Sequence, residues 1–178
     1  MILSFMTKWP KEMPNNISGK LTGFQEKIQI SLIKEGLLNP DDLHQYDRYT
    51  QFNGPELNSK KYRNSINSKK HTIRQDVKDR WRPCILIDFF VFSRTNKMFR
   101  FAPRVSCIST QDIEITYNEE TCDLYGQYPT MFVDKRPLSI IECENLAVND
   151  GFDSMDDFCY YFNKDYSGKI IHWTGIKY

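Results

Sequence analysis

The chain has 178 residues, of which 40% are hydrophobic, 14% aromatic and 26% charged. This composition is typical of a globular protein and excludes a fibrous or intrinsically disordered one, and the length favours a single domain over 1–178. The 24 basic and 23 acidic residues leave a net charge of +1, which by itself argues against a nucleic-acid-binding protein.

The charges are unevenly distributed along the chain. Residues 60–104 include 13 basic and 3 acidic side chains, a net charge of +10. Residues 105–178 include 5 basic and 13 acidic side chains, a net charge of −8. This segregation predicts a basic binding face opposite an acidic one, and it weakens the argument from the total.

The cysteines, histidines and apolar runs exclude several classes of protein. Five cysteines without a Cys-x-x-Cys pair indicate neither a disulfide framework nor a zinc site. The histidines are not at metal-ligand spacing, so neither a metal nor a cofactor is expected. Without a signal peptide or a run near the roughly 18 apolar residues of a membrane span, we expect a cytoplasmic protein with no membrane association. Reduced, small and buried thiols are expected at Cys84, Cys107, Cys143 and Cys159.

The first part of the chain contains a predicted strand at 2–5 and a helix from 23 to about 35. The helix is indicated by apolar residues that recur every four positions, and Thr22 is its candidate N-cap. The polar segment 36–66 has no such periodicity and is interpreted as a loop insertion. The overlapping segment 39–67 is a candidate surface for binding another protein.

Strands dominate the middle of the chain. Apolar or alternating runs predict strands at 71–74, 84–92, 98–109, 112–117 and 131–133. Pro103 marks a bend or a sheet edge within the third of them.

Two helices and a closing strand are predicted at the end of the chain. Ser139-Ile-Ile-Glu142 is a capping-box signature for the first helix, which is expected to stop near 149–151. The second helix is expected to begin at an Asp153 cap and to end at Gly168, before a strand at 169–174. Together the elements predict an α+β fold, a mixed β-barrel of five to six strands with about three flanking helices.

The densest group of basic side chains lies between Asn67 and Arg82. Lysines and arginines alternate there with threonine, histidine and tryptophan. Cations neutralise phosphates and an aromatic ring stacks on a base, so this composition suits nucleic acid. The alternative is a solvated basic loop with Trp81 in the core.

Within this group, Lys69-x-x-Thr72-x-Arg74 resembles the Gly-x-Lys-x-x-Thr/Ser-x-Arg signature of the ASCH family, with Asn67 in place of the usual glycine. Other segments also resemble ASCH proteins, particularly versions common in bacteriophage genomes. These segments are 79–81, 94–95, 105–107, 147–152 and 168–173. The resemblance covers roughly 67–178 together with the first strand and helix.

The resemblance implies a PUA-like β-barrel, a fold related to RNA-binding modules, with a cleft beside the signature. The expected function is binding of a nucleic acid, RNA in the first place, or of a nucleotide through the basic cleft around 69–82. The sequence leaves open whether the ligand is RNA, DNA or a free nucleoside. Candidate binding residues are Lys70, His71, Arg74, Lys78, Arg80, Trp81, Arg82, Arg94 and Trp173.

The resemblance also implies an enzyme as the alternative. Some small ASCH proteins are amidohydrolases that remove the acetyl group from N4-acetylcytidine with a lysine, a threonine and an acidic residue. Those roles would fall on Lys69, Thr72 and Asp150. Thr72 would attack the amide carbonyl, Lys69 would accept its proton, and Asp150 would assist the leaving amine, with Arg74 at the oxyanion or a phosphate. The same side chains binding a ligand without catalysis is the simpler interpretation.

Overall fold

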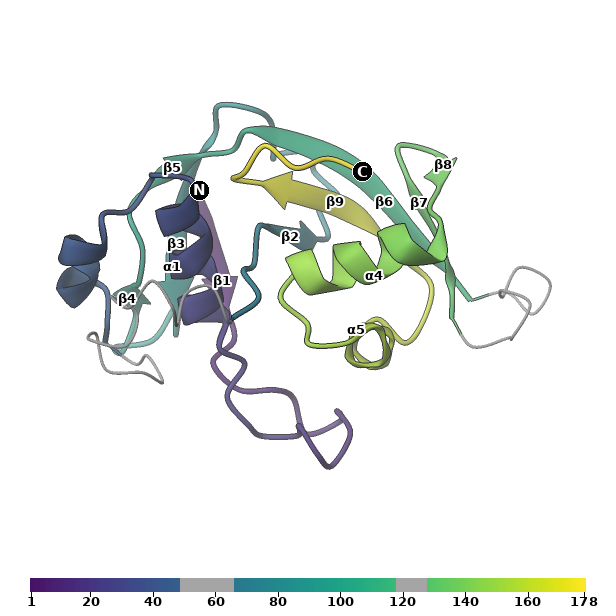
Figure 1. Ribbon diagram of the computed structural model, residues 1–178, viewed down its shortest axis with the longest axis horizontal. Helices are drawn as coiled ribbons and strands as arrows, with labels where there is room; N and C mark the ends of the chain where they lie inside the picture. Colours follow the sequence, from purple (N-terminus) through teal and green to yellow (C-terminus); the bar gives the residue numbers. More distant parts are fainter. Residues whose placement is uncertain (49–65, 118–127) are drawn as a thin grey trace.

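The protein is described by a computed structural model that covers residues 1–48, 66–117 and 128–178. These residues form nine strands, three α-helices and one 3-10 helix, and the strands make two sheets (Figure 1). The fold is α+β as the sequence predicts. The expected barrel is not observed, because neither sheet closes on itself within the described ranges.

The first sheet is built around a central buried strand. β1 (Ile2–Phe5) pairs in parallel with β3 (Leu86–Val91). β4 (Phe99–Arg100) and β5 (Val105–Ser106) both pair with β3 in antiparallel orientation. The bend expected at Pro103 therefore falls in the connection between β4 and β5, which divides one predicted strand into two.

The second sheet has five strands, each antiparallel to its neighbours. In order across the sheet they are β2 (His71–Arg74), β9 (Tyr166–His172), β6 (Ser109–Thr116), β7 (Thr130–Val133) and β8 (Arg136–Pro137). In β6, Ile113 and Ile115 are buried while the acidic residues that alternate with them are exposed, as the sequence predicts.

The helices lie beside the sheets. α1 (Phe24–Lys34) lies near β1 and β3, while α4 (Ile140–Asn149) and α5 (Met155–Tyr161) lie together beside the second sheet (Figure 1). The 3-10 helix η1 (Pro40–Gln45) follows α1. None of the described helices has the length and apolar character needed to cross a membrane.

The capping box predicted for α4 is confirmed: the Ser139 hydroxyl accepts from the backbone N–H of Glu142, and the Glu142 carboxylate accepts from that of Ser139. The caps predicted for the other two helices are wrong. Gly23 is the N-cap of α1, and Thr22 lies one residue before it, where its hydroxyl accepts from the Phe24 N–H over 3.3 Å and donates to the Met6 carbonyl over 2.8 Å.

Ser154 rather than Asp153 caps α5, because the Asp153 carboxylate is paired with Lys27, 2.6 Å away. The predicted helix end at Gly168 is also wrong, since α5 ends at Tyr161 and Gly168 lies inside β9.

The two sheets are connected at one corner and open at another. Between β5 and β6, the Cys107 N–H donates to Ile85, directly before β3 of the first sheet, and the Ile108 N–H donates to His172 in the second sheet, each over 2.8 Å. No backbone ladder joins the edge strands β1 and β2 in the described structure. The Arg74 guanidinium instead donates to the Ser4 carbonyl over 3.1 Å, so a side chain takes the place of the ladder that would close a barrel.

The four described cysteines are free, and Cys122 lies outside the described residues. Cys107 and Cys143 are buried as expected, and Cys159 is partly buried. The expected burial of Cys84 is wrong: this residue is exposed in a turn before β3, at a positive φ of 69°.

Candidate ligand-binding site

A pocket of about 600 Å³ lies where β1 and β2 fail to pair. Its walls come from β1 and the residues after it, α1, the ends of β2 and β3, and the segment from α4 through α5. They comprise Ser4, Phe5, Met6, Thr7, Lys8, Phe24, Lys69, Arg74, Phe92, Ser93, Asp150, Phe152, Tyr161 and Phe162.

Lys69 is held at the pocket by backbone hydrogen bonds on both sides. Its own N–H donates to the carbonyl of Lys27 in α1 over 3.0 Å, and the Lys70 N–H donates to Asn149 in α4 over 2.8 Å. The Lys69 Nζ donates to the Asp150 Oδ1 over 2.8 Å and also to the Asp150 carbonyl. Both side chains are nearly removed from solvent, with 2% and 6% exposure, so this is a buried ion pair facing a pocket.

Two further groups lie against the Asp150 carboxylate. Its Oδ1 accepts the Ile73 N–H over 3.1 Å and lies 3.6 Å from the His71 Nδ1. The next residue, Gly151, has a φ of 94°, which side chains rarely adopt. A Cβ there would lie 3.0 Å from the Phe24 ring and 3.1 Å from the Lys69 Cδ, so glycine leaves room for both pocket walls.

Burial and charge act in opposite directions on this pair. Burial lowers the pKa of Lys69 to about 8, against the opposing effect of the Asp150 carboxylate, while Arg74 and Lys27 act in the same direction as burial. Burial raises the pKa of Asp150, but Lys69 and His71 together outweigh it and hold that pKa below its ordinary value. Lys69 is therefore a cation at neutral pH that loses its proton far more readily than an exposed lysine does.

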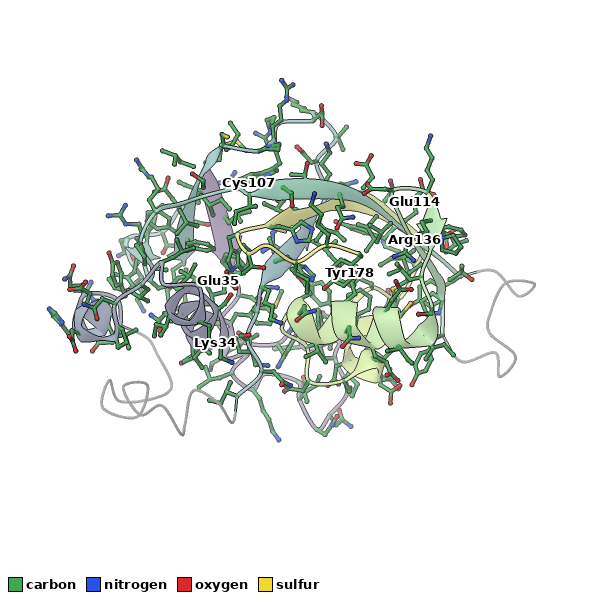
Figure 2. The ribbon with its side chains drawn as sticks, turned by 45° about the horizontal axis from the view of Figure 1, so that its top comes forward. Lys34, Glu35, Cys107, Glu114, Arg136 and Tyr178 are labelled. Carbon is green, nitrogen blue, oxygen red and sulfur yellow. The ribbon has the colours of Figure 1, made fainter. Side chains whose placement is uncertain are left out.

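A buried polar network lies behind Asp150. The Asn149 side-chain amide donates to the Tyr178 hydroxyl over 3.0 Å, and that hydroxyl lies 2.8 Å from the His71 Nε2. Tyr178 lies between the second sheet and α4 (Figure 2). The phenol hydroxyl can both donate and accept, and in the tautomer in which His71 accepts it at Nε2 the imidazole carries its hydrogen on Nδ1, 3.6 Å from the Asp150 Oδ1. Burial lowers the pKa of His71, which favours this neutral form.

The cations of the pocket lie against aromatic rings. The Lys69 Nζ is 4.8 Å from the centre of the Phe24 ring, and the guanidinium carbon of Arg74 is 5.1 Å from that of Phe5. Arg74 also donates to the carbonyls of Ile73 and Ser4, each over 3.1 Å. Within the described ranges no carboxylate forms an ion pair with Arg74, so its charge is available to an anionic ligand.

The structure brings together Lys69, Arg74 and Asp150 of the residues that the sequence singles out. Thr72 is buried but does not line the pocket, and its hydroxyl has no hydrogen-bond partner among the described residues. The two candidate stacking rings are also inside the protein, since Trp81 is 5% and Trp173 0% exposed. Trp173 packs edge-on against Phe89, with ring centres 5.2 Å apart, so neither tryptophan ring is open to a base.

The remaining basic candidates do not line the pocket. Lys78, Arg80 and Arg82 are exposed in the connection from β2 to β3. Arg80 and Arg82 lie 3.9 Å from carboxylate oxygens of Asp76 and Asp79. Lys70 is partly buried, and Arg94 is exposed in the turn that directly follows two pocket residues, Phe92 and Ser93.

Most of the pocket wall could not be identified from the sequence as functional. In the sequence, Phe24, Phe152 and Phe162 look like ordinary core residues, because they lie in or next to runs with the apolar periodicity of helices. Lys8 does not belong to any recognisable motif. Besides the signature at 69–74, the useful signal is Asn149-Asp150-Gly151-Phe152, which contributes two lining residues.

Other sequence candidates fall outside the described structure. Of the proposed insertion at 36–66, the structure describes residues 36–48 and Ile66. The suggested protein-binding surface at 39–67 therefore lies largely outside the described residues. In the residues that the structure covers, no cluster of histidine, cysteine or acidic side chains has the geometry to hold a metal ion. Comparison with known protein families, with curated proteins and with solved structures found no match.

Proposed function

We propose that the protein binds a nucleotide or a single-stranded nucleic acid, RNA in the first place, in the pocket between β1 and β2. The observation that carries this proposal is the lining of the pocket, which combines three cations, Lys8, Lys69 and Arg74, with six aromatic side chains, of which Phe92 and Tyr161 are partly exposed. Asp150 is the single acidic residue among the described lining residues, and Lys69 already neutralises it.

Each part of that lining matches one part of a nucleotide. Aromatic side chains stack on bases of any sequence, and cations that lack a carboxylate partner attract phosphates. Arg74 and the partly exposed ring of Tyr161 both line the pocket, so it offers a phosphate contact and a base contact together. A pocket of about 600 Å³ is also within the usual range for small ligands.

The family and the finer fold are part of the same proposal. Lys69 and Arg74 of the signature that resembles the ASCH family both face the pocket, which supports a kinship with that family. We propose that the two sheets are an opened version of the PUA-like barrel, with the opening between β1 and β2 used for ligand binding.

A binding experiment tests the proposal. We expect labelled single-stranded RNA or a nucleoside monophosphate to bind wild-type protein, and Arg74→Ala to weaken binding about tenfold or more. Arg136→Ala is the matched control, because Arg136 is exposed on β8 and paired with Glu142 away from the pocket. Absence of binding to RNA, DNA and mononucleotides alike would contradict the proposal, as would an Arg74→Ala variant with wild-type affinity.

A second function, amide hydrolysis on an acylated pyrimidine nucleoside, is favoured by one observation. Lys69, whose pKa is lowered to about 8, faces the pocket beside a carboxylate, which is the arrangement expected of a lysine that accepts a proton. The attacking oxygen belongs either to Thr72, which would have to turn its buried hydroxyl toward the pocket, or to a water molecule beside Lys69.

Release of acetate from N4-acetylcytidine tests this second function. We expect Lys69→Met to abolish turnover. Thr72→Val then separates the two sources of the attacking oxygen: it abolishes turnover if the threonine attacks and preserves it if water does. No acetate release at high enzyme concentration removes the enzyme hypothesis and leaves the binding proposal unaffected.

A further inference from the structure

A second hollow adjoins the pocket. It measures about 330 Å³ and shares Arg74, Tyr161 and Phe162 with the pocket. Its remaining lining residues are Ile73, Gln75, Asn163, Lys164 and Tyr166. Because three side chains line both hollows, the two lie next to each other with Arg74 in both linings, and we call the pair the groove.

The second hollow has a cationic and amide lining. Arg74 and Lys164 are its charged residues, and no aspartate or glutamate lies among its described lining residues. Lys164 is exposed and forms no ion pair within the part of the chain that the structure describes. Two cations without carboxylate partners in the described lining of one hollow favour an anionic ligand.

The ring of Tyr166 is placed over the backbone by a glycine. A Cβ on Gly168 would lie 2.8 Å from the Tyr166 ring and 2.6 Å from the Arg74 carbonyl oxygen. Glycine at this position therefore lets the Tyr166 ring fold back along β9 toward the last residue of β2. Tyr166 also packs edge-on against Phe162, with ring centres 5.0 Å apart, which holds the ring as a partly exposed wall of the hollow.

The positive lining ends beyond Lys164. The next hollow along the surface shares Asn163 with this one, but its charged lining residue is Asp156. The cationic side chains that line the two hollows are therefore Lys8, Lys69, Arg74 and Lys164.

We propose that the protein binds two consecutive nucleotides of a single strand, one base in the pocket, the linking phosphate at Arg74, and the second nucleotide against Tyr166 and Lys164. This inference rests on the proposed binding function and specifies its ligand as a strand rather than a free nucleoside. A single nucleoside would leave both Arg74 and Lys164 without an anionic partner, whereas a phosphodiester between two nucleosides reaches the one cationic side chain that both hollows share.

The test compares ligands of increasing length by isothermal titration calorimetry. The ligands are uridine and cytidine, their monophosphates, the corresponding dinucleotides and a ten-nucleotide RNA, with matching DNA. We expect the dinucleotides to bind about tenfold more tightly than the mononucleotides. We also expect Tyr166→Ala and Lys164→Ala to remove most of that gain without changing mononucleotide affinity.

Matched controls separate the ring and the charge from general damage. Tyr166→Phe keeps the ring and is expected to keep the dinucleotide gain. Tyr160→Ala removes an exposed ring outside both hollows, and Lys34→Ala removes an exposed lysine at the end of α1, so neither is expected to change the gain. Lys164 is a surface residue, so Lys164→Ala remains a valid test if Tyr166→Ala does not fold.

The outcomes distinguish this inference from the function on which it rests. Equal affinity for mononucleotides and dinucleotides, or a dinucleotide gain that survives both Tyr166→Ala and Lys164→Ala, overturns the second site and leaves the nucleotide-binding pocket in place. Absence of binding to every ligand in the series overturns both.

Discussion

Lys69 and Asp150 are two charged residues that fold into the interior as a pair. Removing one partner of a buried pair leaves the other without compensation, which costs about 3–5 kcal/mol, whereas replacing both is often much less costly. Asp150 retains the Ile73 N–H and His71 as neighbours when Lys69 is absent, but it loses the lysine ammonium that lies 2.8 Å from its Oδ1.

Lys69→Met is therefore expected to lower the free energy of unfolding by about 3–5 kcal/mol at pH 7. The double variant Lys69→Met with Asp150→Asn is expected to recover part of that loss, because the uncompensated carboxylate is gone. Urea unfolding followed by circular dichroism measures both. Equal stabilities for the single and double variants would show that the charge pairing is not the source of the loss.

His172 provides a second prediction, on acid stability. It is fully buried, neither ring nitrogen has a hydrogen-bond partner among the described residues, and burial together with the neighbouring His71 lowers the pKa of His172 to about 3. Between pH 6.5 and 3 the unfolded chain thus binds more protons than the folded one. The free energy of unfolding falls as the pH falls through this window, by as much as several kcal/mol.

The expected result is a shallower pH dependence in His172→Phe than in wild-type protein over pH 3–6.5. His71, whose pKa is lowered in the same direction, continues to contribute in the variant. The exposed His44 in η1 supplies the control, because His44→Gln is expected to leave the wild-type slope unchanged. Chemical unfolding at a series of pH values gives the slopes, and parallel curves for wild-type protein and His172→Phe would refute the assignment.

At the scale of elements, Tyr178 at the C-terminal end of the chain forms hydrogen bonds with three elements, β2, α4 and β6. Its hydroxyl contacts His71 in β2 and Asn149 in α4, and its backbone N–H donates to the Gln111 side chain in β6 over 3.0 Å. The Gln111 amide in turn donates to the Tyr178 carbonyl over 2.9 Å, so one side chain serves both backbone groups.

Tyr178→Phe is expected to destabilise the protein by about 1–3 kcal/mol, because it leaves buried nitrogens of His71 and Asn149 without their shared partner. The loss is measured by thermal or urea unfolding. Tyr160→Phe, which removes an exposed hydroxyl, is the control and is expected to have little effect. A Tyr178→Phe variant as stable as the control would show that the hydroxyl network contributes nothing.

Local sequence signals predict helices best where the cap is decided locally. The start of α4 follows from Ser139 and Glu142, which satisfy each other's backbone groups within one turn. The start of α5 cannot be predicted in this way, because Asp153 and Ser154 are both good N-cap residues. The Asp153 carboxylate binds Lys27, which is 126 residues away in the sequence, and Ser154 is the cap. Gly168 resembles a helix end in the sequence because its actual role, making room for Tyr166, depends on packing.

At the scale of the whole molecule, the described basic residues of the segment 60–104 lie in separate places. Lys69 and Arg74 line the groove, whereas Arg80 and Arg82 are exposed beside acidic residues in a separate connection. The three pocket residues that the sequence identifies lie in or beside short motifs. The walls from β1, α1 and α5, and the opening between β1 and β2, depend on tertiary packing that no local pattern encodes.

This distribution predicts a selective effect of charge on binding. The logarithm of the affinity for single-stranded RNA is expected to fall linearly with the logarithm of salt concentration, and Arg74→Ala is expected to reduce the magnitude of that slope by about 0.7, the value for one phosphate contact. Arg82→Ala is expected to leave the slope unchanged. Fluorescence anisotropy at salt concentrations from about 50 to about 300 mM measures the slope. A larger change for Arg82→Ala than for Arg74→Ala would place the phosphate contacts outside the groove.

The unpaired edges of β1 and β2 have a consequence for how the molecule behaves in solution. Exposed strand edges are templates for pairing with another chain, and proteins commonly protect them with charged groups. In this protein Arg74 occupies the Ser4 carbonyl at one edge, and Asp150 occupies the Ile73 N–H at the other. Two side chains that line the pocket thus also occupy backbone groups at both unpaired strand edges, groups that would otherwise be open to pairing with another chain.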